Sequence, residues 1–353
     1  MAEGSHQPVM VDEVLSFLAG RGVVVDCTVG LGGHAGALLE GGVGTVVGID
    51  RDPAALALAR ERLAGYGERF SPVEARFSEA PEEHLPQGGA DGVLYDLGVS
   101  SMQLDAPERG FGYRVDGPLN MRMGGDGPSA KDIVNGVPEE ELGALIRDFG
   151  EERHWRRIAG AIVRARSREP IETTGQLARI VAGAVPRAGR KAPHPARRTF
   201  QALRIAVNRE LEELAASLPR MAGLLAPGGR IVVIAYHSLE DRIVKHGLRD
   251  DDRLTVLTKR PLRPSAEETA RNPRSRGAKL RAAERIEDES MKAVHEVGNR
   301  EAKALGDHGW EPGVQGGSSP AERSGADQAA AVPLAEEDRR RRSSDDSRTG
   351  RAA

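Results

Sequence analysis

A glycine-rich turn and an aspartate downstream of it are the first residues in this sequence whose types and spacing suggest chemistry. The turn, Gly30-Leu31-Gly32-Gly33-His34, follows a run of valines, and Asp50 lies 18 residues after Gly32. Glycines after a strand let the backbone approach a ligand closely, and an acid ending the next strand can accept both hydroxyls of a ribose. A turn that serves packing alone is the alternative.

The turn favours a nucleoside ligand over a dinucleotide. It does not fit G-x-G-x-x-G, because Ala35 stands at the third glycine position. A pyrophosphate needs an unobstructed helix N-terminus, and His34 stands at that position. A ligand without phosphates fits better, and S-adenosylmethionine is one such ligand.

A second acid, Asp96, ends another apolar run, within the segment DGVLYD. At the end of a strand in an open α/β sheet it would face the reactive group of a bound ligand. An aspartate there can hold a substrate amine or a cofactor atom. A turn-forming or capping acid is the alternative.

The elements around these residues alternate between strand and helix. Short apolar runs predict strands over 23–26, 45–50, 71–77, 91–96, 230–236 and 254–258. Helical spacing over 9–18 and 54–63 falls before and between them. This alternation predicts an α/β fold with a doubly wound, mostly parallel sheet.

The alternation stops for about a hundred residues after Asp96. From about residue 110 to about residue 216 the pattern is helical, and its last apolar stripe, 200–218, predicts one long helix. We therefore expect a helical domain, 110–216, inserted between two parts of the sheet domain, 1–109 and 217–286. The segment 287–353 has few large apolar residues and no periodicity, so we expect it to be disordered.

The 353 residues include 50 Lys and Arg against 53 Asp and Glu, but these charges are unevenly distributed. Residues 147–209 contain 15 basic and 5 acidic side chains, and residues 259–285 contain 9 and 3. Two basic blocks in an otherwise acidic protein favour a polyanion partner such as nucleic acid. Solvated helix faces would give the same composition.

A single cysteine, Cys27, excludes an internal disulfide framework and a cysteine-cluster metal site. We expect no metal. The N-terminus has no basic segment followed by an apolar stretch, and no apolar run approaches the roughly 20 residues that span a membrane. These features predict a cytoplasmic protein without a membrane partner.

Six segments together resemble the bacterial small-subunit ribosomal RNA cytosine-N4 methyltransferase family. They are HQPVMVDEVL (6–15), DCTVGLGGHAG (26–36), GIDRDPAAL (48–56), DGVLYDLGVSSMQLDAPERGFGYRVDGPLNMRM (91–123), RRTFQALRIAVNRELEEL (197–214) and GGRIVVIAYHSLEDRIVK (228–245). They run in the family's order, and the long block after residue 91 is the most specific. The resemblance ends near residue 285 and leaves out the tail.

The resemblance implies a class I S-adenosylmethionine-dependent methyltransferase fold with an inserted helical domain. It implies S-adenosylmethionine as the cofactor and, as substrate, a cytidine in the decoding region of 16S ribosomal RNA, presented by the small subunit. The positions that match the family's cofactor-binding residues are Gly32, Gly33, His34, Asp50, Phe77, Asp96 and Gln103. Phe77, at the end of an expected strand, could line an adenine pocket; without the resemblance, a core residue is the alternative.

Methylation of an exocyclic amine needs acceptors for the amine hydrogens. Asp96 is the first candidate for a catalytic acceptor, and a backbone carbonyl within Leu97 to Val99 is the alternative. The residue that stacks on the target base is open, with Tyr236 and His237 as candidates; a turn before a helix cap is the alternative for both. Helical basic side chains are candidate contacts for RNA phosphates. They are Arg153, Arg156, Arg157, Arg164, Arg197, Arg198 and Arg204.

Three other functions stay open at this stage. The first is a dinucleotide-dependent oxidoreductase on the same fold, which would retain NAD. The second is a non-catalytic RNA-binding or ribosome-assembly factor that has lost the chemistry. The third is a methyltransferase for a free nucleotide or a protein, whose activity would not depend on salt.

Overall fold

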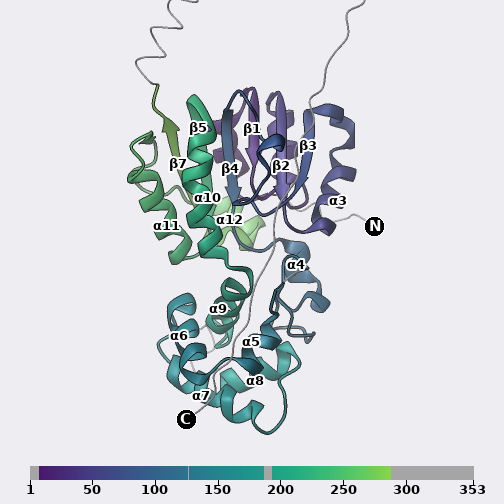
Figure 1. Ribbon diagram of the computed structural model, residues 1–353, viewed down its shortest axis with the longest axis vertical. Coiled ribbons are helices and arrows are strands. Elements are labelled where there is room, and N and C mark those ends of the chain that lie inside the picture. The colour runs from purple at the N-terminus through teal and green to yellow at the C-terminus, as the bar shows by residue number, and fades with distance from the viewer. Residues whose placement is uncertain (1–7, 126, 187–192, 288–353) are drawn as a thin grey trace, which may run out of the picture. The chain divides into compact units, whose positions relative to one another are not determined.

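The structure, a computed structural model, describes residues 8–125, 127–186 and 193–287. Within these ranges seven strands form one sheet in the order β3-β2-β1-β4-β5-β7-β6, and Figure 1 shows this order from β3 to β7. β1 to β5 pair in parallel, whereas β7 is antiparallel to both β5 and β6. The doubly wound, mostly parallel sheet is confirmed. The strands are β1 Val23–Asp26, β2 Thr45–Asp50, β3 Phe70–Glu74, β4 Ala90–Asp96, β5 Leu225–Ala235, β6 Leu254–Val256 and β7 Lys279–Arg285.

Helices cover both faces of the sheet, because successive side chains of each strand point to opposite faces. Val24, Val46 and Leu94 pack in one core with α1, α2 and α3, whereas Val25 and Tyr95 pack in another with α10 and α11. Burial on both faces explains why the strands are continuous apolar runs. These helices are α1 Val11–Leu18, α2 Gly33–Glu40, α3 Pro53–Arg62, α10 Glu210–Leu224 and α11 Ser238–Arg249.

A third core, between Phe111 and Val207, belongs to the helices that separate β4 from β5 in the chain (Figure 1). In it α6 packs against α7 and α9, and α7 packs against α8. The expected boundary at residue 216 falls inside α10, whose Leu214 already belongs to the sheet's core. These helices are α5 Ala130–Gly136, α6 Glu139–Gly150, α7 Trp155–Arg166, α8 Thr174–Ala184 and α9 Arg197–Asn208; the short α4 Ser101–Asp105 and α12 Ala266–Arg271 lie outside this core.

The prediction of one long helix over 200–218 is wrong. α9 ends at Asn208, and Arg209 takes a left-handed conformation with φ 52° before α10 begins. The backbone carbonyl of Asn208 accepts from the side chain of Arg51 at 3.1 Å. In a continuous helix this carbonyl would instead accept from the backbone amide one turn further along the chain. The apolar stripe continues across this corner and conceals it.

Two further expectations differ from the structure or lie beyond it. β3 ends at Glu74 rather than at residue 77, so Phe77 lies in the loop that follows the strand. The tail expected to be disordered lies, apart from Glu287, outside the described residues. Among the helices of the described ranges, none is long and apolar enough to cross a bilayer.

Candidate active site

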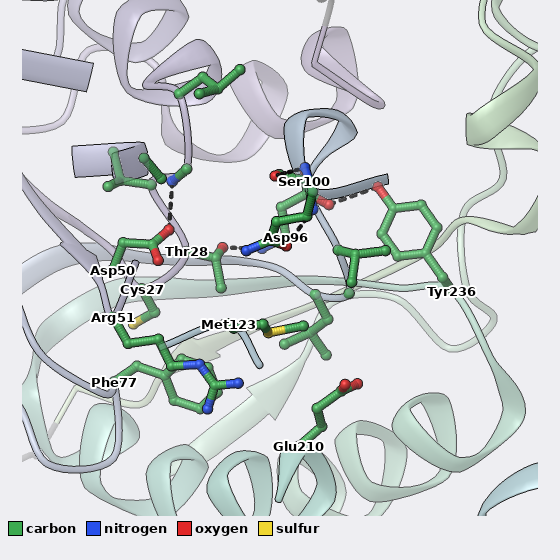
Figure 2. A pocket seen from close by; sticks show the side chains of 18 of the residues that line it. Cys27, Thr28, Asp50, Arg51, Phe77, Asp96, Ser100, Met123, Glu210 and Tyr236 are labelled. Atoms are coloured by element: carbon green, nitrogen blue, oxygen red, sulfur yellow. Dashed lines mark hydrogen bonds between the residues drawn. The ribbon is translucent and has the colours of Figure 1, made fainter. Parts of the chain in front are cut away.

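A cavity of about 370 Å³ opens at the carboxyl ends of β1, β2 and β4. Figure 2 shows Asp50, Phe77, Asp96 and Tyr236 around it, with Glu210 on the opposite wall. Doubly wound sheets bind ligands at this edge. The cavity therefore gathers the strand-end residues that the sequence singled out.

The glycine turn forms one wall because its backbone needs conformations and space that other residues lack. Gly30 and Gly32 have φ of 51° and 74°, in the left-handed region. A Cβ on Gly33 would lie 2.8 Å from Pro8 Cγ, and one on Gly32 would lie 2.9 Å from Leu63 Cδ1. Gly30 and Gly33 line the cavity, whereas Gly32 caps α2 and packs against Leu63.

Asp50 lies at the end of β2 and is bonded to the turn. Its Oδ2 accepts from the amide of Gly30 and its Oδ1 from that of Asp52, each at 2.9 Å. Burial raises the pKa of Asp50, and the two amide hydrogen bonds oppose this rise. A carboxylate offers about four acceptor positions, so positions remain for the two hydroxyls of a ribose.

Phe77 lines the same end of the cavity from the loop after β3. Its ring meets the ring of Tyr95 edge to face, with centroids 5.5 Å apart. Cys27 and Leu214 add apolar surface beside it. This end of the cavity can hold a planar aromatic base next to the ribose-binding carboxylate.

Asp96 lies at the end of β4, between Tyr236 and His34. The Tyr236 hydroxyl donates to Asp96 Oδ1 at 2.7 Å, and the Asp96 amide donates to Thr28 Oγ1 at 2.6 Å. Burial, and then the Asp96 charge, raise the pKa of Tyr236 well above its ordinary value, so the phenol stays a neutral donor. The hydroxyl of Tyr236 thus orients the candidate catalytic carboxylate.

His34 lies at the start of α2 and is buried. Its Nε2 is 2.9 Å from the carbonyl oxygen of Val9, which can only accept, so Nε2 carries a proton. Its Nδ1 lies 3.6 Å from Asp96 Oδ2. One ring nitrogen is thereby left facing the carboxylate of Asp96.

His237, the other stacking candidate, is the N-cap of α11. The amide of Glu240 donates to its Nδ1 at 3.4 Å, and Glu240 in turn accepts from the amide of His237 at 3.2 Å. His237 thus forms the helix cap itself, together with Glu240, whereas the sequence placed it in a turn before the cap.

Gln103 connects two loops at the cavity. Its Oε1 accepts from the amide of Ser100 at 3.1 Å, and its Nε2 donates to Asp52 Oδ2 at 3.1 Å. Asp52 also accepts from Arg109 at 2.8 Å and caps α3 through the amide of Ala54. Gln103 lines the cavity, and both ends of its amide already have protein partners.

Asp26, which the sequence reasoning missed, is 1% exposed at the end of β1. Its Oδ1 accepts from the amide of Thr28 at 3.1 Å, whereas Oδ2 has no hydrogen-bond partner among the described residues. Burial raises the pKa of Asp26 to about 7, and the charge of His34 opposes this rise. The valines before it suggested only a strand end.

Asn208, also missed, joins the loop after β2 to the helical region. Its Oδ1 accepts from Arg51 at 2.7 Å and from the amide of Met123 at 2.9 Å. Its Nδ2 donates to the carbonyls of Met121 and Arg204 at 2.8 and 2.9 Å. No local sequence signal marks it, because its partners other than Arg204 lie far away in the chain.

The expectation that Arg204 contacts phosphate on the surface needs correction. Its Nε and Nη2 donate to the two carboxylate oxygens of Glu210 at 2.8 and 2.7 Å. Both side chains line the cavity, and that of Arg204 is only 16% exposed. Arg204 therefore faces the site rather than the solvent.

The other six arginines expected to bind RNA are exposed: Arg153, Arg156, Arg157, Arg164, Arg197 and Arg198. The start of α9 adjoins the loop before α7, because Arg198 donates to the carbonyl of Glu151 at 3.0 Å. Glu151 also accepts from Ser238 and Arg242 of α11. The two ends of the first basic block therefore meet beside α11, which follows the strand that ends near Tyr236.

The second basic block, 259–285, is partly structural. Lys279 and Arg281 donate to Asp241 at 3.0 and 2.8 Å. Arg285 donates to the carbonyls of Gly223 and Leu225. These three side chains stabilise the β7 end of the sheet, so this block offers fewer charges to a partner than its composition suggested.

One group of residue types suited to a metal occurs in the described ranges: Glu210, His237 and Glu240, with ligand atoms within 4.8 Å of one another. Arg204 already occupies both oxygens of Glu210, and Glu240 accepts from the amides of Tyr236 and His237. The positive charge beside this group is therefore supplied by the guanidinium of Arg204.

The strand order, the glycine turn after β1 and the acids ending β2 and β4 define a class I S-adenosylmethionine-dependent methyltransferase. The cavity fits that cofactor, since Asp50 retains acceptor positions beside an apolar pocket and the backbone of Gly30 and Gly33 lines the same cavity. The model of the MraW methylase family matches residues 3–286, and the chain belongs to this family.

Curated relatives resemble this chain over most of its length. A protein named ribosomal RNA small subunit methyltransferase H from Geobacter sulfurreducens is 51% identical over 308 residues, which cover 80% of this chain and 99% of that protein. Proteins of the same name from Methylobacterium sp. and Heliobacterium modesticaldum are 49% and 46% identical, covering 81% and 80% of this chain and 93% and 98% of those proteins.

Proposed function

We propose that this protein transfers the methyl group of S-adenosylmethionine to the exocyclic N4 amine of a cytidine in the decoding region of 16S ribosomal RNA. One observation carries the proposal. A single cavity runs from the nucleoside-binding residues Asp50 and Phe77 to the oriented carboxylate of Asp96. The names of the relatives and the resemblance of the six sequence segments supply the substrate.

The residues that would hold the cofactor divide by chemistry. Asp50 binds the ribose hydroxyls and Phe77 lines the adenine pocket. The set that the resemblance implies is completed by Gly32, Gly33, His34, Asp96 and Gln103. When bound, S-adenosylmethionine supplies an electrophilic methyl group on a sulfonium. Leu97 and Val99, which follow Asp96 and line the cavity, supply apolar surface that keeps water from this group.

Asp96 has the central part in the chemistry. The N4 amine of cytosine is a weak nucleophile, because its lone pair is conjugated into the ring. Asp96 accepts a hydrogen bond from the amine, which helps the nitrogen to pyramidalise, and then takes up the proton that leaves it. The hydroxyl of Tyr236 donates to Oδ1 and so holds the carboxylate in place for this step.

Exposed arginines would bind the RNA. Aromatic residues make up only 3% of the chain, so contacts to the phosphate backbone outweigh base stacking. The target base must leave its stack to reach the cavity. A substrate presented by the small ribosomal subunit places the protein in the cytoplasm.

A transfer assay tests the proposal. The protein is incubated with labelled S-adenosylmethionine and small subunits that lack the modification, and the RNA is then analysed as nucleosides. We expect label in N4-methylcytidine. Retention of NAD, binding of subunits without transfer, or transfer to a nucleotide or protein at a rate independent of salt would each replace the proposal with the corresponding alternative.

A further inference from the structure

The wall of the cavity opposite Asp96 is charged. Figure 2 shows the carboxylate of Glu210 directed into the cavity. Arg204 binds it with two parallel hydrogen bonds, and both side chains are largely buried, at 16% and 11% exposed. Glu240, nearly buried, lines the same wall.

The guanidinium of Arg204 retains unused donors. It has five N–H groups, of which Glu210 takes two. Within the described ranges no acceptor is bonded to either N–H of Nη1. Burial opposes the positive charge, but Glu210 and Glu240 outweigh it and raise the pKa of Arg204. The cavity wall therefore presents a permanently charged donor group.

The ion pair is not the sole support of the corner between α9 and α10. Asn208 already holds that corner through Arg51, Met121 and Met123. Removing a buried ion pair from water costs free energy that its own attraction often fails to recover. A buried pair at a ligand cavity, beside a corner already held, indicates a role in binding.

We propose that Arg204 binds the target cytosine, donating from Nη1 and Nη2 to its N3 and O2 atoms while the N4 amine faces Asp96. This assignment rests on the proposed function. Two adjacent acceptors on a base edge match the parallel N–H groups of an arginine. Uracil carries a hydrogen on N3, so its N–H would face an N–H of Arg204 and could not accept from it. The contact therefore selects cytosine over uracil. Glu210 is a positioning residue that fixes the plane of the guanidinium.

The placement of Arg204 on α9 fits a base that has left its stack. Arg197 and Arg198, exposed at the start of the same helix, precede it by seven and six residues, which is about 10 Å along the axis. They can hold the phosphates of the strand at the surface. Arg204, two turns further on, then reads the base edge inside the cavity.

The test is a double-mutant cycle between the protein and the base. Small subunits are reconstituted with cytidine or 3-deazacytidine at the methylated position, and the rate of transfer is measured for both. The protein variants are Arg204→Lys and the double variant Arg204→Gln with Glu210→Gln, which leaves no unpaired buried charge. Arg230→Lys, in the Arg230–Glu284 pair outside the cavity, is the matched control.

We expect each cavity variant to lower kcat by about 10-fold to 100-fold on cytidine, the loss of one bidentate base contact. Affinity for S-adenosylhomocysteine and the thermal unfolding midpoint should stay at wild-type levels for Arg204→Lys. The 3-deaza substitution should slow the wild-type protein and Arg230→Lys at least 5-fold more than it slows the double variant.

An equal effect of the 3-deaza substitution on the wild-type protein and the double variant would overturn the contact between Arg204 and N3. Wild-type kcat in Arg204→Lys would overturn it as well. Absence of transfer by the wild-type protein to the cytidine substrate is a different result, because it overturns the proposed function itself.

Discussion

The carboxylate of Asp50 accepts two backbone amides, so a substitution there acts on the glycine turn as well as on a ligand. We predict that Asp50→Ala weakens binding of S-adenosylmethionine at least 10-fold, because hydrogen bonds between a charged acceptor and the ribose are lost. Asp50→Asn, which keeps one amide partner, should remain closer to wild type in stability. Calorimetric titration and thermal unfolding separate the two effects, and undiminished affinity in folded Asp50→Ala would refute the ribose assignment.

Tyr236 acts on the reaction through Asp96. Tyr236→Phe removes the hydroxyl that donates to Oδ1 while keeping the ring, so Asp96 loses its orientation and one neutral donor. We predict a drop in kcat of about 10-fold with little change in cofactor affinity. Single-turnover transfer measured against pH checks this, because a purely structural role for the hydroxyl would lower stability without moving the pH profile.

Asp26 links stability to pH. Its pKa is raised to about 7 in the folded protein, so the folded state binds a proton that the unfolded state has released above pH 4. Stability therefore falls as pH rises towards 7, by at most about 4 kcal/mol. Asp26→Asn imitates the protonated form, and its unfolding midpoint should decline less than that of the wild type between pH 5 and pH 8. Parallel curves for the two proteins would contradict the buried charge.

The predictability of these residues from sequence depended on how local their signals are. Gly33, Asp50 and Asp96 lie at or shortly after the ends of apolar runs, so the strand patterns alone indicated them. Phe77 and Gln103 entered only through the resemblance to a family, since a lone aromatic or amide has no distinctive spacing. Asn208 was not foreseen, because its role comes from contacts with residues more than 80 positions away.

At the scale of elements, the strands were predictable and the corner between α9 and α10 was not. Strands buried on both faces are continuous apolar runs, which a sequence displays directly. The corner interrupts the helix at Arg209 but leaves the apolar stripe continuous. Val207 and Leu214, on either side of it, are both buried, but in different cores. A periodic pattern records burial, and it does not record which core a residue enters.

Arg209 offers a test of this corner. Its φ of 52° lies in the left-handed region, which costs a residue with a Cβ about 1 kcal/mol, and its pair with Glu212 is exposed. We predict that Arg209→Gly leaves stability unchanged or raises it by about 0.5–1 kcal/mol. Arg209→Ala should not share this gain. Chemical denaturation checks both, and a marked loss in Arg209→Gly would show that the arginine side chain itself holds the corner.

At the scale of the whole molecule, charge is unevenly distributed along the chain. The region up to residue 146 is acidic overall, with 23 acidic and 10 basic side chains, whereas Arg197 and Arg198 are exposed at the start of α9. An exposed basic group in an otherwise acidic protein attracts a polyanion locally. We expect this attraction at the start of the helix that also carries Arg204.

This asymmetry predicts a salt-dependent difference between two matched charge reversals. Arg197→Glu with Arg198→Glu should raise the KM for small subunits at least 10-fold and reduce the slope of log affinity against log salt by roughly 1 to 2. Arg60→Glu with Arg62→Glu, exposed on α3, makes the same change of net charge away from the basic block. It should have a much smaller effect on KM. Transfer rates at several salt concentrations check both variants, and equal losses would mean that net charge rather than this surface governs RNA binding.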